Sequence, residues 1–145
     1  HKAHLNLENK TVDGKDAGMP AYKNGVNTAH DIPGLFAVGA SYEVLPRLTA
    51  NVGYHHFFDS SAKMANDKQK YTGNGTNEYL AGVEYKINDM FLVSAGGQIT
   101  RYGVKDDFQS DISFSVNSYS LGFGGAVNVS ENVQINIGYF KIFLF

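Results

Sequence analysis

From position 32 onward the chain alternates apolar and polar residues through six segments of roughly ten to thirteen residues each. In the first segment Phe36, Val38 and Tyr42 fall on one face, while Gly39 and Ser41 fall on the other. This period of two indicates β-strands whose two faces meet different surroundings. The segments exceed the ~5–6 residues usual in soluble strands and match the ~9–11 tilted residues that cross a bilayer. The pattern therefore predicts membrane-spanning strands.

The two faces of these segments differ in chemistry. The second face carries mainly Gly, Ser, Thr, Asn and Gln, with few charges. A water-facing sheet surface is commonly rich in Lys and Glu, whereas small uncharged residues suit the inside of a curved barrel wall. We therefore expect the apolar face to meet lipid, at seven positions in particular: Phe36, Val38, Val52, Val83, Val93, Phe123 and Ile135.

The connections between the segments fall into two classes. Three are short, at Leu45–Pro46, Asn88–Asp89 and Ser130–Asn132, and two are long and polar, at Asp59–Thr76 and Gly103–Asn117. Short and long connections alternate strictly along the chain. Outer-membrane barrels have the same asymmetry, with short periplasmic turns and long extracellular loops. The predicted fold class is therefore all-β, an antiparallel up-and-down transmembrane β-barrel.

The number and direction of the strands predict that this chain supplies only part of a barrel. Residues 1–145 are expected to be part of one β-barrel domain, with six antiparallel transmembrane strands in 32–145. Residues 1–31 would be the end of an upstream strand, within "AHLNLE", followed by an extracellular loop. The last strand would run outward, whereas a complete barrel has an even strand number and both termini in the periplasm. We therefore expect the remaining strands of the same barrel to complete it.

Tyrosines recur near the ends of the segments, among them Tyr42, Tyr79, Tyr119 and Tyr139. A ring with an apolar body and a polar tip is stable at the boundary between membrane and water. Tyrosine also favours strands in any setting. The spacing predicts an aromatic girdle, and the simple strand preference of tyrosine is the alternative.

Four charged residues fall on the polar face beside the short turns: Glu43, Arg47, Glu84 and Lys86. Charges placed inside a barrel pair with one another to avoid isolated burial. We expect them to form a small structural ion network near the periplasmic end of the lumen. A ligand site built from the same residues is the alternative.

The sequence offers no catalytic, metal or cofactor site. His55 and His56 are adjacent on a strand, so their side chains point to opposite faces and cannot chelate one metal. Asp106, Asp107 and Asp111 lack the spacing of a calcium loop. "GFGG" opens no helix, and "TGNGTN" is typical of a turn-rich loop rather than a phosphate cradle. With a net charge of −2 and no cysteine, nothing favours nucleic acid, disulfides or thiolate ligands.

Three stretches carry a family resemblance: "HDIPGLFAVGASYEVLPRLTANVGYHHFFDSSAKM", "NEYLAGVEYKIND" and "SYSLGFGGAVNVSENVQINIGYF". Their order resembles the outer-membrane long-chain fatty-acid transporter family, the FadL/TodX-like barrels for hydrophobic compounds. The resemblance runs from about residue 25 onward. It implies a barrel of about fourteen strands, within the range of outer-membrane barrels, with an N-terminal plug in the lumen. In that family the plug, and a kinked strand that opens a gap in the barrel wall, lie in the N-terminal part. Neither is in this sequence, so no ligand-binding residue is carried over.

The resemblance implies a location and a function. We expect the protein to lie in the bacterial outer membrane and to take up hydrophobic compounds such as long-chain fatty acids. Its partners would be membrane lipid, a hydrophobic small molecule and the remaining strands of the same barrel, with no nucleic acid and no cofactor. Two alternatives stay open: a structural or secretion-associated outer-membrane barrel without transport, and a soluble lipocalin-like lipid-binding barrel.

Overall fold

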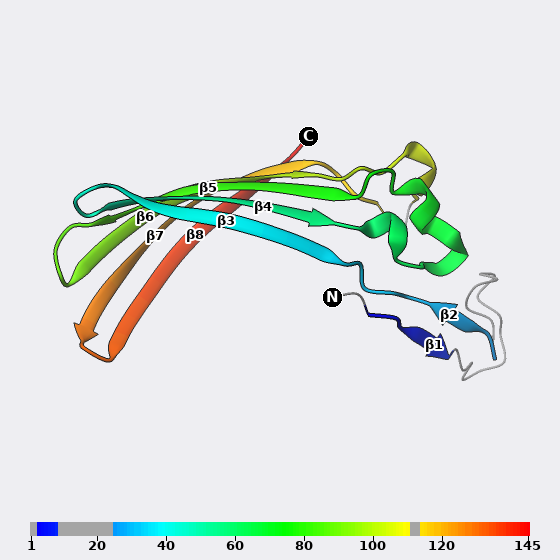
Figure 1. Cartoon of the computed structure of the whole chain (residues 1–145), viewed down its shortest axis with the longest axis horizontal. Helices are drawn as coiled ribbons and strands as arrows, with labels where there is room; N and C mark the ends of the chain where they lie inside the picture. The colour runs from blue at the N-terminus through cyan, green and yellow to red at the C-terminus, as the bar shows by residue number, and fades with distance from the viewer. Residues whose placement is uncertain (1–2, 9–24, 111–113) are drawn as a thin grey trace. The chain divides into compact units, whose positions relative to one another are not determined.

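The computed structural model describes residues 3–8, 25–110 and 114–145, and this part of the chain is mostly β-structure (Figure 1). A short antiparallel pair joins β1 (Asn6–Glu8) to β2 (Asn27–Ala29). A second sheet contains the remaining strands, namely β3 (Leu35–Leu45), β4 (Leu48–Phe57), β5 (Thr76–Lys86), β6 (Phe91–Arg101), β7 (Ser118–Ser130) and β8 (Val133–Leu144).

The six-stranded sheet is a meander in which each strand lies beside the next one along the chain, from β3 to β8. The pairs β5–β6, β6–β7 and β7–β8 are antiparallel, with one irregularity between Asn128 and Ser130. The prediction of six long strands in up-and-down order is therefore confirmed. The sheet does not close, since β3 and β8 are its two edges, and the barrel stays a prediction.

Short turns lie where the sequence places them. Only Pro46 and Arg47 separate β3 from β4, and Arg47 adopts a positive φ of 75°. Between β5 and β6, the Asn88 side chain accepts hydrogen bonds from the N–H groups of Met90 (2.9 Å) and Phe91 (2.8 Å). An asparagine side chain used in this way replaces a backbone turn contact. The turns are thus fixed by local chemistry.

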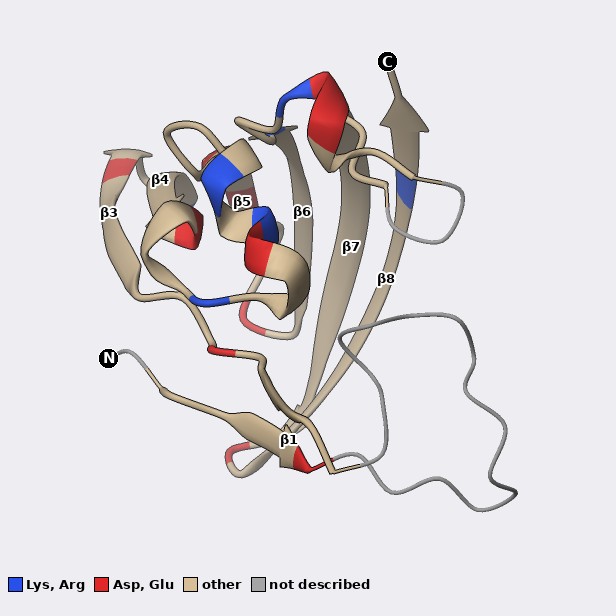
Figure 2. Ribbon diagram, turned by 90° about the vertical axis from the view of Figure 1, so that its right-hand side faces the viewer, with Lys and Arg blue, Asp and Glu red and all other residues tan. Residues whose placement is uncertain are grey.

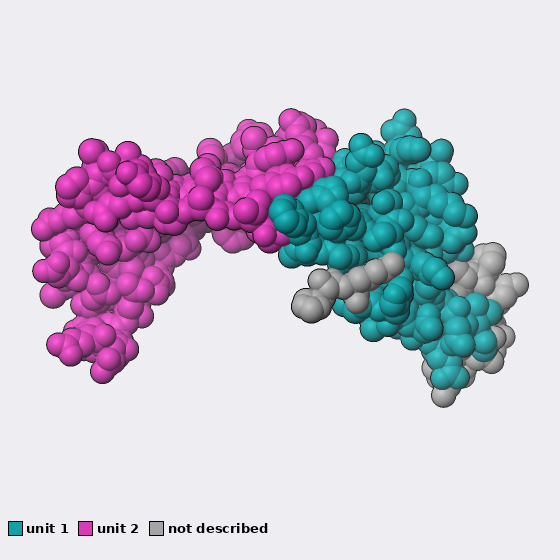
Figure 3. Space-filling model, in the orientation of Figure 1, with its two compact units in different colours: residues 1–36, 56–76, 102–115 teal, residues 37–55, 77–101, 116–145 magenta. Residues whose placement is uncertain are grey.

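The chain divides into two compact units, shown in different colours in Figure 3. The first contains residues 1–36, 56–76 and 102–115, and the second contains residues 37–55, 77–101 and 116–145. The first unit holds the β1–β2 pair and three 3-10 helices, η2 (Asp59–Ser61), η3 (Ala65–Tyr71) and η4 (Asp106–Phe108).

The long connections of the first unit pack against each other. The Lys105 N–H donates to the Tyr71 carbonyl at 2.8 Å. The Lys68 ammonium lies 5.4 Å from the centre of the Phe108 ring. The side chain of Ala62, in the same unit, is fully buried. The described parts of both connections therefore make contacts of their own.

The β1–β2 pair differs in part from the prediction for residues 1–31. β1 does lie within "AHLNLE", but it pairs with β2, with Leu7 opposite Thr28, in a segment that was expected to be a loop. Strands of three residues are too short to show a periodicity. Their pairing therefore follows from contacts that are distant in sequence.

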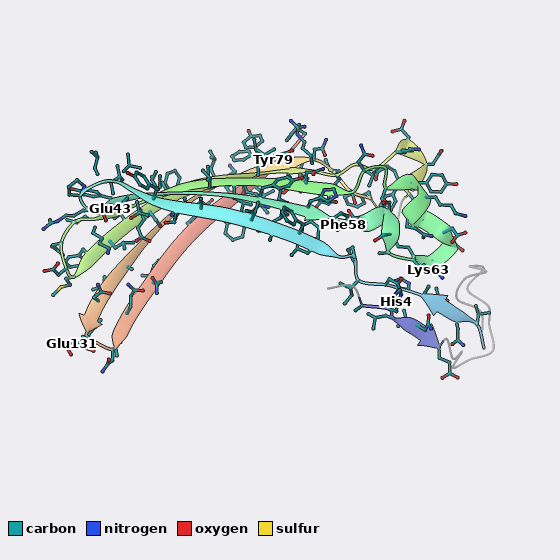
Figure 4. All side chains as sticks on the ribbon, in the orientation of Figure 1. His4, Glu43, Phe58, Lys63, Tyr79 and Glu131 are labelled. Carbon is teal, nitrogen blue, oxygen red and sulfur yellow. The ribbon has the colours of Figure 1, made fainter. Side chains whose placement is uncertain are left out.

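The second unit lacks the apolar core of a soluble domain. Ala126 is its only buried apolar side chain among the described residues, whereas Val38, Phe123 and Ile137 are 54%, 65% and 77% exposed. Figure 4 shows side chains projecting from both surfaces of the long strands. Burying a Val, Ile or Phe side chain is worth about 1.5–3 kcal/mol. The exposed apolar side chains would gain this free energy only where an apolar surface or an apolar solvent covers the sheet.

Candidate functional site

The strand register of the second unit places the apolar residues on one face. Val83 lies opposite Ala95, and Ala95 lies opposite Phe123. Val127 lies opposite Ile135, and Val127 is in the same phase as Phe123 along β7. Because residues directly opposite each other share a face, Val83, Phe123 and Ile135 project to the same side, which we call the apolar face. Val93, two residues before Ala95, joins them.

The remaining predicted lipid-facing residues lie on β3 and β4. A Cβ built on Gly53 would lie 3.6 Å from the Cβ of Leu80, so Gly53 shares the face opposite to Val83. Val52 therefore projects to the apolar face. Phe36, Val38 and Val52 are all at least half exposed. Their contact with lipid stays a prediction, but their alternation and exposure agree with it.

Aromatic rings form a row on the apolar face near one end of the sheet. Tyr79 lies opposite Ile99, Ile99 lies opposite Tyr119, and Tyr119 lies opposite Phe143. The Tyr54 ring extends this row, with its centre 5.3 Å from that of Tyr79. The Tyr54 hydroxyl donates to the Asn77 side chain at 2.7 Å. A row of rings at one level is the arrangement that a membrane boundary favours.

Glycines cross the opposite face in register, and we call this the glycine face. Gly82 lies opposite Gly96, and Gly96 lies opposite Gly122. Gly124 and Gly138 form a further pair on β7 and β8. A hollow of about 490 Å³ follows these glycines. The hollow therefore results from missing side chains rather than from a gap between strands.

A second hollow of about 440 Å³ lies on the glycine face near the short turns. Side-chain amides run along it: Gln134 donates to Asn128 at 2.9 Å, and Asn136 donates to Gln134 at 3.3 Å. Asn128 in turn donates to the carbonyl of Asp89 at 2.8 Å. The amides tie β7 and β8 to the turn between β5 and β6 and give the hollow a polar lining.

The four residues of the predicted ion network lie in two groups, Glu84 with Lys86 and Glu43 with Arg47. Glu84 and Lys86 both line the polar hollow. Arg47 instead donates its backbone N–H to the Glu43 carboxylate (3.3 Å) and its guanidinium to the carbonyl of Ile87 (3.0 Å). These contacts are hydrogen bonds that fix the turn before β4. The network as a set of ion pairs stays a prediction.

One polar pair on the glycine face was not identified in the sequence. His55 Nδ1 lies 3.0 Å from the Glu78 carboxylate, and both side chains are partly buried. His56, on the other face of β4, makes an edge contact with Phe58 at 4.6 Å between ring centres. The opposite orientation of the two histidines agrees with the sequence argument. The signal for the pair was the shared phase of His55 and Glu78 on neighbouring strands.

The other motifs take structural positions. "GFGG" lies inside β7, where a Cβ on Gly124 would come within 2.9 Å of the Ser94 hydroxyl. "TGNGTN" forms the turn into β5, with positive φ at Gly73 and Gly75. Asp106 and Asp107 begin η4, while Asp111 lies outside the described residues.

Asp31 links three segments of the first unit. Its carboxylate, only 3% exposed, accepts hydrogen bonds from His4 Nδ1 (3.0 Å), the Lys63 N–H (3.0 Å) and the Leu5 N–H (3.3 Å). Figure 4 shows the labelled His4 and Lys63 in this unit. Enclosure alone would raise the pKa of Asp31, but the Lys63 N–H, the charge on His4 and the Leu5 N–H together hold it below its ordinary 3.8.

We expect the Asp31 contacts to depend on pH. Because the folded-state pKa is lowered, the carboxylate stabilises the fold at pH values above 3.8, and this contribution is lost as the pH falls through the folded pKa. Asp31→Asn should abolish the dependence and speed amide exchange at Leu5 and Lys63 at neutral pH. Hydrogen exchange followed by mass spectrometry measures both effects.

Asp67→Asn is the matched control for this prediction. The pKa of Asp67 is also lowered, by hydrogen bonds from Lys70 and Gln69, but both members of the Asp67–Lys70 pair are about two-thirds exposed. An exposed pair within one short helix contributes little, so exchange at Leu5 should not change. Equal effects of the two substitutions would contradict a linking role for Asp31.

Figure 2 shows β7 without a charged residue, whereas the helices of the first unit carry both acidic and basic residues. None of the described helices has the length and apolar character needed to span a membrane. Within the described ranges, no three His, Asp or Glu side chains are grouped so that they could hold a metal ion.

A scan against protein-family models, a search of curated proteins and a search of solved structures each give no match for this chain.

Proposed function

We propose that this chain forms part of the wall of an outer-membrane β-barrel that takes up hydrophobic compounds such as long-chain fatty acids. The observation that carries the membrane part is the exposed apolar face, which spans strands of ten to thirteen residues. Such a face is stable against lipid, and a barrel places the opposite face toward its lumen.

The glycine face supports the same proposal. It carries two hollows and few charges, which suits a lumen that admits molecules of low polarity. The open edges at β3 and β8 leave backbone N–H and C=O groups without sheet partners on one side. In lipid each unpaired group costs several kcal/mol. Further strands therefore pair with β3 and β8 in the closed barrel.

The uptake of hydrophobic compounds rests on the family resemblance of the strand and loop order. Full-length protein reconstituted in lipid vesicles should take up labelled fatty acid in a saturable manner. Unlabelled fatty acid should compete, whereas sugars and small ions should neither compete nor pass. Saturable passage of sugars or ions instead would indicate a porin.

Two further outcomes would decide for the alternatives. A protein that inserts into vesicles but neither binds nor transports fatty acid would be a structural or secretion-associated barrel. A protein that stays monodisperse without detergent would contradict the membrane wall and favour a lipocalin-like fold. Sedimentation in the presence and absence of detergent measures this directly.

A further inference from the structure

Three aromatic rings and two cations form a continuous cluster where β6 and β8 end and β7 begins. The Tyr119 and Phe143 rings stack with centres 4.8 Å apart and planes 12° apart, and the Phe145 ring lies 6.0 Å from Tyr119. The Arg101 guanidinium lies 4.4 Å from the centre of the Phe145 ring. The Lys141 ammonium lies 5.0 Å from the centre of the Phe143 ring. We call these five residues the aromatic–cation cluster.

The register places this cluster on the apolar face. Tyr119 lies opposite Phe143, and Leu121 lies opposite Lys141, in the same phase as Phe123. Arg101 is two residues beyond Ile99, which also belongs to this face. Both cations are exposed, whereas Phe143 is half-buried by its neighbours. Two positive charges therefore project from a surface that is otherwise apolar.

These charges have no acidic partner in the part of the chain that the structure describes. Each cation instead lies over the face of an aromatic ring, Arg101 over Phe145 and Lys141 over Phe143. A ring face attracts a cation but leaves its N–H donors unused, and guanidinium has five of them while ammonium has three. An anion with several acceptor oxygens would satisfy these donors, and phosphate has this chemistry.

We propose that the aromatic–cation cluster docks the phosphate headgroup of an anionic lipid in the outer leaflet. This inference rests on the proposed function, because it requires the apolar face to lie in a membrane. The cluster lies at the end of the sheet from which the long connection between β6 and β7 emerges, which is the outer side of such a barrel. Aromatic rings occupy the headgroup level there, and basic side chains reach the lipid phosphates.

The test compares two spin-labelled lipids on full-length protein in phosphatidylcholine vesicles. Phosphatidylglycerol should associate more strongly than phosphatidylcholine, as measured by electron paramagnetic resonance. Arg101→Gln and Lys141→Gln should each lower the ratio of association constants roughly five-fold, and together bring it near one. Arg101→Lys and Lys141→Arg keep the charge and should retain most of the preference.

Lys86→Gln is the matched control for Lys141→Gln. It removes the same charge from the same sheet but on the glycine face, and it should leave the ratio unchanged. A ratio near one in the unaltered protein, or an unchanged ratio in the double variant, would overturn the docking site while leaving the membrane wall intact. Displacement of the labelled lipid by 10-fold excess inorganic phosphate would assign the cluster to soluble anions instead. Failure of the unaltered protein to insert would overturn the proposed function itself.

Discussion

Replacing Val93 with arginine is expected to destabilise the folded protein in lipid by about 2 kcal/mol, the lower end of the cost at the bilayer midplane, because Val93 lies toward one end of its strand. Val93 lies near the start of β6 on the apolar face, opposite Tyr85 and Gly125, and its side chain is 44% exposed. If lipid covers this face, the guanidinium must remain in hydrocarbon or distort the bilayer to reach water. Urea unfolding in lipid vesicles, followed by the band shift of folded barrels in unheated gels, measures the change in free energy of unfolding.

The same substitution on the glycine face is the control. Gln98 lies on β6 opposite Leu80 and Ser120, and its amide donates to the Thr100 hydroxyl at 3.0 Å. Gln98→Arg loses that hydrogen bond, but in the proposed barrel the new guanidinium would face a water-filled lumen, so the expected cost is about 1 kcal/mol. Equal tolerance of arginine at Val93 and at Gln98 would show that the apolar face does not meet lipid.

Replacing Gly75 with alanine is expected to destabilise the first unit by about 3 kcal/mol or more. Gly75 has a φ of 82°, a conformation that costs L-residues energy, and a Cβ built on it would overlap the Phe57 carbonyl. Gly103, which lies beside it, is also constrained, since its Cβ would lie 2.7 Å from the Gly75 carbonyl oxygen. Backbone atoms cannot yield as a flexible side chain can, so the turn between η3 and β5 must shift.

Gly25→Ala separates the cost of the backbone conformation from the cost of the overlap between the Cβ and backbone atoms. Gly25 has a nearly identical φ of 78°, but nothing lies within 4 Å of the Cβ built on it. Its substitution should therefore cost only about 1 kcal/mol from backbone conformation. Amide exchange across residues 56–76 measures the loss for Gly75→Ala, which should also expose the buried Thr72 and Thr76. Similar exchange in the two variants would contradict a role for close packing at Gly75.

The strands and turns of this protein follow from local chemistry. Side chains on a strand alternate between faces, so the phase of Val83, Phe123 and Ile135 could be assigned from spacing, and the register confirms it. The short turns were equally predictable, because proline and asparagine act on their own backbone and immediate neighbours. The spacing also places Lys141 in the phase of the apolar residues, but it does not show which ring the ammonium contacts.

The contacts between distant segments could not be read in this way. Asp31 meets Lys63, His55 meets Glu78, and Arg101 meets Phe145 only because the fold brings segments that are distant in sequence together. A period of two assigns a face, but it specifies neither the level along the neighbouring strand nor the rotamer of the side chain. The packing of the long connections at Gly75 and Gly103 likewise depends on two turns that are separate in sequence. Local alternation thus determines the strands and their faces, whereas register and loop packing determine which side chains meet.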